Sequence, residues 1–219
     1  MRVHSWLSER CCIQASNLGG SGVFTRCNLE PHELVAVWGG QILSEDEIAK
    51  MQEAFPALEA KSIRVAPGFR LASSSLFARD DAEMFNHSCD PNLGMVGSLM
   101  IVTRKAVPEG AELTVDYETI DDVPNSFECR CKSPDCRESI SGEAWKDAAF
   151  RQQHCGYLSS YIEWLIRTSN CNDKTYVSET RLGKGLFTAV ALRPGEVAFR
   201  FAGPIISLAD AIAMGEPRR

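Results

Sequence analysis

The chain is 219 residues long, and its 44% hydrophobic and 24% charged residues describe an ordinary globular protein with enough apolar side chains for a core. A net charge of −6 argues against a nucleic-acid binder that works by bulk electrostatic attraction. The N-terminus has no apolar run of signal-peptide length, and no stretch is long enough to span a membrane. We therefore expect a soluble intracellular protein, cytoplasmic or, in a eukaryote, nuclear.

The first third of the chain is predicted to form short strands with one helix. Gly20, Ser21 and Gly22 lie between the first two strands. Glycines there permit a tight turn or a close approach of the backbone to a ligand, and the pattern alone favours the turn. Ser44 followed by Glu47 forms a capping box, which predicts a helix from there to about Ala54. Strands are predicted at residues 11–15, 23–25, 34–38, 41–43, 63–66 and 69–71.

Two stretches in the middle of the chain carry most of its polar chemistry. Residues 86–92 read Asn-His-Ser-Cys-Asp-Pro-Asn, a composition typical of a turn, in which a His and a Cys are unusual unless their lone pairs are used. Residues 112–117 read Glu-Leu-Thr-Val-Asp-Tyr, and their alternation predicts a half-buried strand that presents Tyr117 at its end. A hairpin is predicted between them, at 93–96 and 99–103.

The spacing of three cysteines, Cys-x-Cys-x4-Cys, predicts a zinc site. Cys129, Cys131 and Cys136 can supply three corners of a tetrahedral thiolate site, and Cys89 is the natural candidate for the fourth. The alternative is a set of incidental free thiols. The other cysteines show no such pattern and are expected to be core or surface thiols: Cys11, Cys12, Cys27, Cys155 and Cys171.

Acidic residues are concentrated between Asp80 and Asp122, where ten carboxylates stand against only Arg104 and Lys105. One interpretation is a solvated acidic face. The other is a surface that attracts a basic peptide. The sequence does not choose between the two.

The C-terminal part changes character. Apolar residues recur at three- and four-residue spacing between 142 and 169, which predicts helices separated near Gly156. Further on, residues 185–207 align without gaps onto residues 22–44. The tail is therefore predicted to repeat the beginning of the main domain, with no second copy of the two central stretches. Such a half-unit should lack catalytic function, and its unpaired strand edges could support self-association.

Residues 86–92 and 112–117, taken together, resemble the two hallmark motifs of the SET-domain protein-lysine methyltransferases. The resemblance covers residues from about 10 to 142. It implies that Tyr117 is the catalytic tyrosine. It also implies that S-adenosylmethionine (SAM) is the co-substrate and that zinc is held by Cys89 and the three later cysteines, as in a post-SET segment. The residues implied to contact SAM are Gly20, Ser21, Gly22, Asn86, His87, Tyr117 and Phe127.

Some of these roles have alternatives, and some positions depart from the family. His87 could act mainly through its backbone, and Phe127 could instead be an aromatic of a small core. Trp38 stands where the family often has a Tyr, and relatives often carry an Arg at the position of Glu83. Val115 occupies a position where an aromatic often controls how many methyl groups fit, which leaves the number of methyl groups open.

The resemblance implies a mainly β fold with some α-helix (α+β), in which small sheets enclose a pseudoknot. We expect a SET domain at 10–126, a post-SET zinc segment at 127–142, a helical extension at 143–170 and a truncated second SET-like half-unit at 175–219. The expected activity is SAM-dependent methylation of a lysine in a basic protein or peptide context, without membrane or nucleic-acid partners. The alternative is a catalytically weak SET module that binds peptides or acts as a scaffold.

Overall fold

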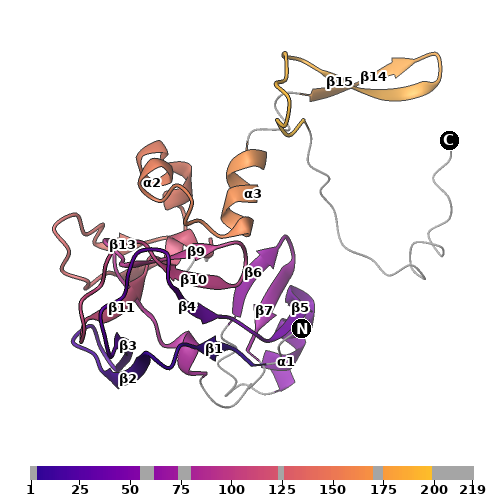
Figure 1. Cartoon of the computed structure of the whole chain (residues 1–219). Coiled ribbons are helices and arrows are strands. Elements are labelled where there is room, and N and C mark those ends of the chain that lie inside the picture. Colours follow the sequence, from indigo (N-terminus) through magenta and orange to yellow (C-terminus); the bar gives the residue numbers. More distant parts are fainter. Residues whose placement is uncertain (1–3, 55–61, 74–79, 123–125, 170–174, 199–219) are drawn as a thin grey trace. The chain divides into compact units, whose positions relative to one another are not determined.

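The computed structural model describes residues 4–54, 62–73, 80–122, 126–169 and 175–198. The chain divides into two units, Met1–Glu163 and Trp164–Arg219. The first unit consists of small sheets with short helices, an α+β architecture (Figure 1). No helix in the described part of the chain has the length and apolarity needed to cross a membrane.

Two four-stranded sheets form the centre of the first unit. One has the order β1-β4-β10-β9, from β1 (Trp6–Leu7), β4 (Leu34–Val37), β10 (Met100–Thr103) and β9 (Leu93–Val96). The other has the order β2-β3-β11-β8, from β2 (Cys11–Ala15), β3 (Ser21–Thr25), β11 (Glu112–Val115) and β8 (Asn86–His87). The fully buried residues Val23, Ile101 and Leu113 belong to the core between them.

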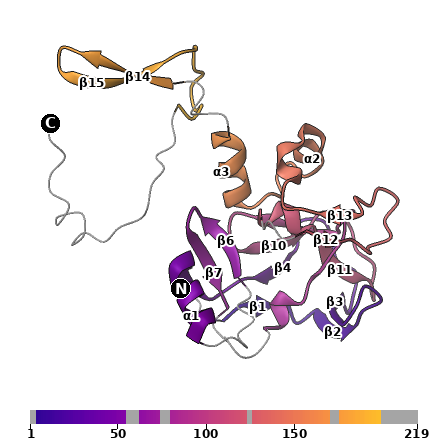
Figure 2. The same cartoon turned by 180° about the vertical axis from the view of Figure 1, so that it is seen from behind.

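A third sheet, β5-β7-β6, lies at the opposite side of the unit from β2 and β3 (Figure 2). It consists of β5 (Gln41–Ser44), β7 (Phe69–Ala72) and β6 (Ser62–Ala66), and α1 (Glu45–Ala54) follows β5 directly. The predicted capping box is confirmed, because Glu47 N donates to Ser44 Oγ at 3.2 Å and Ser44 N donates to Glu47 Oε2 at 2.7 Å. The strand boundaries agree with the prediction to within two residues.

Two details of the central motifs differ from the prediction. Residues Asn86–His87 are a short strand, β8, which pairs in parallel with β11 through Thr114↔Asn86 and Val115↔His87. The predicted turn therefore begins only after His87. Strand β11 ends at Val115, and Tyr117 is the first residue of a 3₁₀ helix, η2 (Tyr117–Thr119), capped by the Asp116 carboxylate. The tyrosine thus lies two residues beyond the end of the strand, not within it.

The segment after β11 carries a minimal hairpin and then helices. Strands β12 (Phe127–Glu128) and β13 (Ser139–Ile140) pair on either side of the cysteine turn. The predicted helices are confirmed as η3 (Ala144–Lys146), α2 (Ala148–Gln153) and α3 (Ser160–Thr168). Gly156 separates α2 from α3 with a φ of 81°, a conformation that favours glycine.

In the second unit, β14 (Thr175–Thr180) and β15 (Gly183–Thr188) form an antiparallel hairpin. Its exit turn resembles that of β3: Thr25 Oγ1 donates to the carbonyl of residue 27, and Thr188 Oγ1 donates to the carbonyl of residue 190. Five residues on, both segments turn again, at His32 with a φ of 68° and at residue 195 with a φ of 80°. The two segments thus share these turns; the predicted repeat itself stays a prediction, and its part after residue 198 lies outside the described residues.

Candidate active site

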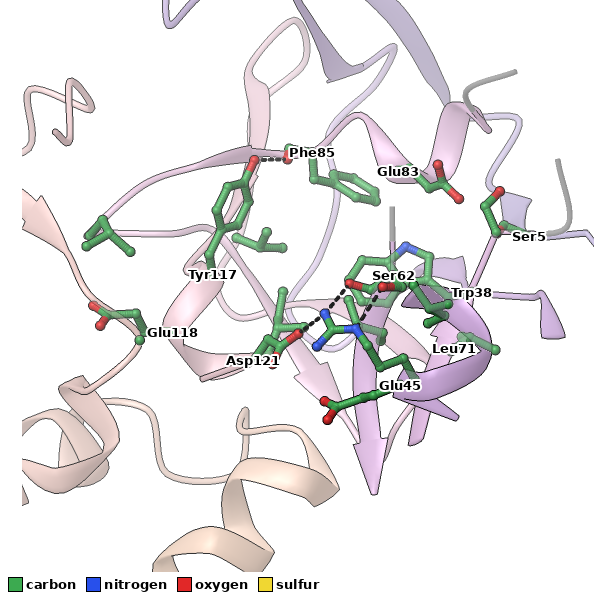
Figure 3. A pocket seen from close by; sticks show the side chains of 18 of the residues that line it. Ser5, Trp38, Glu45, Ser62, Leu71, Glu83, Phe85, Tyr117, Glu118 and Asp121 are labelled. Atoms are coloured by element: carbon green, nitrogen blue, oxygen red, sulfur yellow. Dashed lines mark hydrogen bonds and ion pairs between the residues drawn. The ribbon is translucent and has the colours of Figure 1, made fainter. Parts of the chain in front are cut away.

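The candidate active site is a cavity of about 640 Å³ in the first unit. Tyr117 and Phe85 lie on one side of it, and Trp38 and Leu71 lie on the other (Figure 3). Val115, on β11, also lines the cavity and is buried. The walls are therefore largely apolar and aromatic, which suits a long aliphatic side chain.

Tyr117 is held by its backbone and by its hydroxyl. The hydroxyl donates to the Phe85 carbonyl at 2.9 Å, and the backbone N–H donates to His87 Nδ1 at 3.2 Å. Tyr117 as a whole residue is 39% exposed. The phenol is thus fixed at the cavity wall while its surface stays accessible.

The imidazole of His87 contacts both Tyr117 and the cysteine group. A backbone N–H can only donate, so Nδ1 accepts from Tyr117 and the neutral ring carries its proton on Nε2. That nitrogen lies 3.3 Å from Cys89 Sγ. Burial lowers the pKa of His87, which keeps the ring neutral at pH 7. The structure thus places this side chain between Tyr117 and the thiols.

Phe127 lies beside these two residues. Its ring centroid is 6.1 Å from that of Tyr117 and 5.9 Å from that of His87. It is 41% exposed and lines the cavity. Phe127 is thus a wall residue of the cavity and not an enclosed core aromatic, and its contact with SAM stays a prediction.

Trp38 lines the cavity with its aromatic ring, and its indole N–H is already hydrogen-bonded within the protein. Its indole N–H donates to the Ala82 carbonyl at 2.7 Å. The aromatic surface expected here is therefore present, and its one donor is already satisfied.

The other predicted cofactor residues meet at the edge of the β3-β11-β8 sheet. The Asn86 amide donates to the Ser21 carbonyl at 3.1 Å and to Glu112 Oε1 at 2.7 Å. Gly20 and Ser21 are exposed, and a side chain at Gly22 would collide with Glu112 and Asn86. The sequence interpretation gave no role to Glu112, although Glu112 is the first residue of the second motif, residues 112–117. Its carboxylate orients the Asn86 amide towards this turn.

The four predicted metal ligands come together. The Sγ atoms of Cys89, Cys129, Cys131 and Cys136 all lie within 4.8 Å of one another. A tetrahedral zinc site with bonds of about 2.3 Å requires sulfurs about 3.8 Å apart, and Cys89 and Cys129 are separated by 3.8 Å. The other described cysteines, Cys11, Cys12, Cys27 and Cys155, are free, and Cys171 lies outside the described residues.

Backbone donors surround these thiols, as a thiolate set requires. Cys89 Sγ accepts the N–H of Arg137 at 3.4 Å, and Cys136 Sγ accepts the N–H of Glu138 at 3.4 Å. Burial raises the pKa of Cys89 and raises the pKa of Cys129 to about 11. At Cys131 burial also opposes ionisation, but the N–H of Cys89 and the Ser133 hydroxyl outweigh it and lower the pKa to about 6. The donor set therefore fits a metal that binds thiolates.

The acidic run is in part internal. Asp116, Glu118 and Asp121 are 0%, 2% and 7% exposed, so neither a solvated face nor an attractive surface describes them. Asp121 pairs with Arg70 at 2.8 Å. Asp116 and Glu118 both pair with Arg137, at 2.8 and 2.9 Å. The sequence interpretation assigned no role to Arg137, although its position directly after the metal-ligand candidate Cys136 pointed to it.

Comparison with known proteins agrees with this geometry. The SET domain family model matches residues 20–118. Histone-lysine N-methyltransferase ash1 of Drosophila melanogaster is 26% identical over 140 residues, which are 57% of this chain and 6% of that protein. Probable histone-lysine N-methyltransferase set-23 of Caenorhabditis briggsae is 25% identical over 152 residues, 63% of each chain. The chain thus spans less than two thirds of each of these relatives.

Proposed function

Because the chain carries a SET domain over residues 20–118, we propose that it is a SAM-dependent protein methyltransferase that acts on a lysine side-chain nitrogen. The observation that carries the proposal is the Tyr117 phenol, held by the Phe85 carbonyl at 2.9 Å in the wall of an apolar cavity. The names of the relatives make histones the first substrates to test.

The cavity favours the reactive form of lysine. A free lysine has a pKa of about 10.4, so only about one in a few thousand is neutral at pH 7. The apolar part of the wall, which includes Val115, Phe127 and Trp38, disfavours the ammonium. Carboxylates also line the cavity and act in the opposite sense: Glu45, Glu83, Glu118 and Asp121. The Tyr117 hydroxyl donates to Phe85, so its oxygen lone pairs can accept an N–H from the amine and aim the nitrogen lone pair.

The glycine turn and Asn86 suit the polar ends of SAM. The exposed main chain at Gly20 and Ser21 offers peptide groups, and Asn86 is held in place by Glu112. Bound SAM would supply a methyl group on a sulfonium; the amine lone pair forms the new N–C bond while the C–S pair returns to sulfur. Asn86 is the first residue of β8, and the second, His87, lies beside Tyr117, with ring centroids 5.3 Å apart.

We further propose that the four-cysteine group binds one structural zinc ion. Such a site would join two parts of the chain: Cys89, and the segment that begins with Phe127 and carries the other three cysteines. It would thereby fix that segment next to Tyr117. Structural zinc contributes roughly 10 kcal/mol or more to folding in small domains. Metal analysis of the reduced, folded protein should find about one zinc per chain, and its absence would refute this assignment.

The test of the function is incubation with SAM and core histones, followed by mass-spectrometric mapping of methylated lysines. Calorimetric titration with SAM on the same preparation separates the alternatives. Binding together with methylated lysine supports the enzyme. A folded protein that neither binds SAM nor methylates any candidate would support the peptide-binding or scaffold alternative.

A further inference from the structure

The residues on both sides of Tyr117 are buried carboxylates. Asp116 is fully buried and Glu118 is 2% exposed, whereas Tyr117 between them is 39% exposed. Because Tyr117 is not enclosed, packing alone does not determine its place. Its buried neighbours position its backbone, together with the N–H contact to His87, and its hydroxyl is held by the contact to Phe85 described above.

Both neighbours bind Arg137, the residue directly after the last cysteine of the group. Arg137 Nη1 and Nη2 each donate to an Asp116 oxygen at 2.8 Å, a two-pronged contact. Arg137 Nε donates to Glu118 Oε2 at 3.1 Å. The guanidinium is also 5.2 Å from the centroid of the Phe150 ring. Three of its nitrogens are therefore used on the two residues that flank Tyr117.

Arg137 is connected to the thiols through its backbone. Its N–H donates to Cys89 Sγ at 3.4 Å, and its chain neighbour is Cys136. The other Glu118 oxygen, Oε1, accepts the N–H groups of Ser141, Glu143 and Ala144 at 3.0–3.2 Å. The segment after the cysteines is thus joined to the Tyr117 backbone at two successive points.

We propose that Arg137 is a positioning residue that transmits the geometry of the four-cysteine group to Tyr117. The proposal rests on the proposed function. Arginine suits this role because its planar fork reaches both carboxylates in one orientation, and a lysine keeps the charge but not the fork. A displacement of about 1 Å at a reacting group can cost about 100-fold in rate.

The first test compares Arg137→Lys with Arg130→Lys. Arg130 lies in the same cysteine turn, but its side chain is 76% exposed and pairs with Glu128 at the surface. We expect Arg137→Lys to lower kcat at least tenfold with KM for SAM and zinc content unchanged, and Arg130→Lys to leave kcat within twofold. In a Tyr117→Phe background the loss from Arg137→Lys should shrink to less than threefold, because Arg137 acts through Tyr117.

The second test does not need activity. The chain has four tyrosines, so 3-fluorotyrosine labelling gives four ¹⁹F resonances, and Tyr117→Phe identifies the one from Tyr117. Arg137→Lys should shift or broaden that resonance and leave the other three in place. If Arg137→Lys does not fold, Glu118→Gln replaces it, since it keeps an acceptor for the three N–H groups and removes part of the Arg137 contact.

The outcomes separate the two proposals. A displaced Tyr117 resonance in a protein that methylates nothing would refute the proposed function and support the positioning role. An unchanged resonance with unchanged kcat would overturn the positioning role. Loss of zinc with an unchanged Tyr117 resonance would overturn it as well, because Arg137 would then serve only to retain the metal.

Discussion

The imidazole of His87 accepts a hydrogen bond from the backbone N–H of Tyr117, at 3.2 Å. This contact orients the ring so that its second nitrogen lies 3.3 Å from Cys89 Sγ. One side chain thus links the candidate catalytic residue to the candidate metal group. The same residue was expected to contact SAM, with a role through its backbone as the alternative. The position of its side chain between Tyr117 and Cys89 favours the backbone alternative.

Substitutions at the adjacent residues Asn86 and His87 should therefore affect different functions, SAM binding in the first case and zinc retention in the second. We expect His87→Ala to speed zinc loss to a chelator by about 10-fold or more, because it removes a donor to the Cys89 sulfur. Its SAM affinity should change less than threefold. Asn86→Ala should do the reverse, with weaker SAM binding and normal zinc retention. Chelator-monitored zinc release and SAM titration measure both; a large loss of SAM affinity in His87→Ala alone would contradict this division.

Removal of the Tyr117 hydroxyl should isolate catalysis from binding. Tyr117→Phe keeps the ring contacts with His87 and Phe127 but loses the hydrogen bond to the Phe85 carbonyl. We expect turnover to fall about 100-fold or more, the scale of deleting one positioned polar group from a reacting centre. SAM affinity and methylation rate are measured on one preparation. Full turnover in this variant would remove Tyr117 from the mechanism.

The tail should be dispensable for cofactor binding. A chain that ends after Ser169 keeps all of the first unit and the whole of α3. The cavity, the glycine turn and the four cysteines all lie in that unit. We expect SAM affinity within threefold of the full chain by calorimetry. A soluble truncated protein that no longer binds SAM would show that the tail belongs to the active unit.

Stability should decrease in mild acid because of His154. Burial, opposed by Asp116 and reinforced by Arg104 and Arg137, lowers its pKa from 6.5 to about 4. Between pH 6.5 and about pH 4, His154 is therefore protonated in the unfolded chain but not in the folded chain. The free energy of unfolding consequently falls as the pH drops through this range. The full effect is on the order of 3 kcal/mol.

The measurement is urea unfolding at several pH values, with His154→Gln as the control. The variant retains a group able to accept from Arg104, as His154 Nδ1 does at 3.1 Å. It also retains the cysteines, so acid effects on the thiols cancel in the comparison. The pH slope between 6.5 and 4 should be shallower in the variant. Parallel profiles for the two proteins would rule out His154 as the source.

Some features of the chain are encoded locally and could be predicted from sequence. The capping box of Ser44 and Glu47 depends on residues three apart, and the alternation of β11 depends on neighbours. The four cysteines were predicted as one group because a metal demands thiolates of a given number and spacing. In each case the signal lies within a few residues or in a fixed chemical requirement.

Other features were decided only by tertiary structure. The two-residue strand β8 is too short to show a period, and it forms because β11 offers its open edge. A run of carboxylates carries no mark of burial, yet Asp116 is fully buried because Arg137, 21 positions later, reaches both of its oxygens. Pairing across such a distance costs chain entropy that only the folded contacts repay. The sequence by itself therefore determined the motifs and the candidate ligands. The packing of distant segments decided which of the charged groups next to Tyr117 are buried and what they pair with.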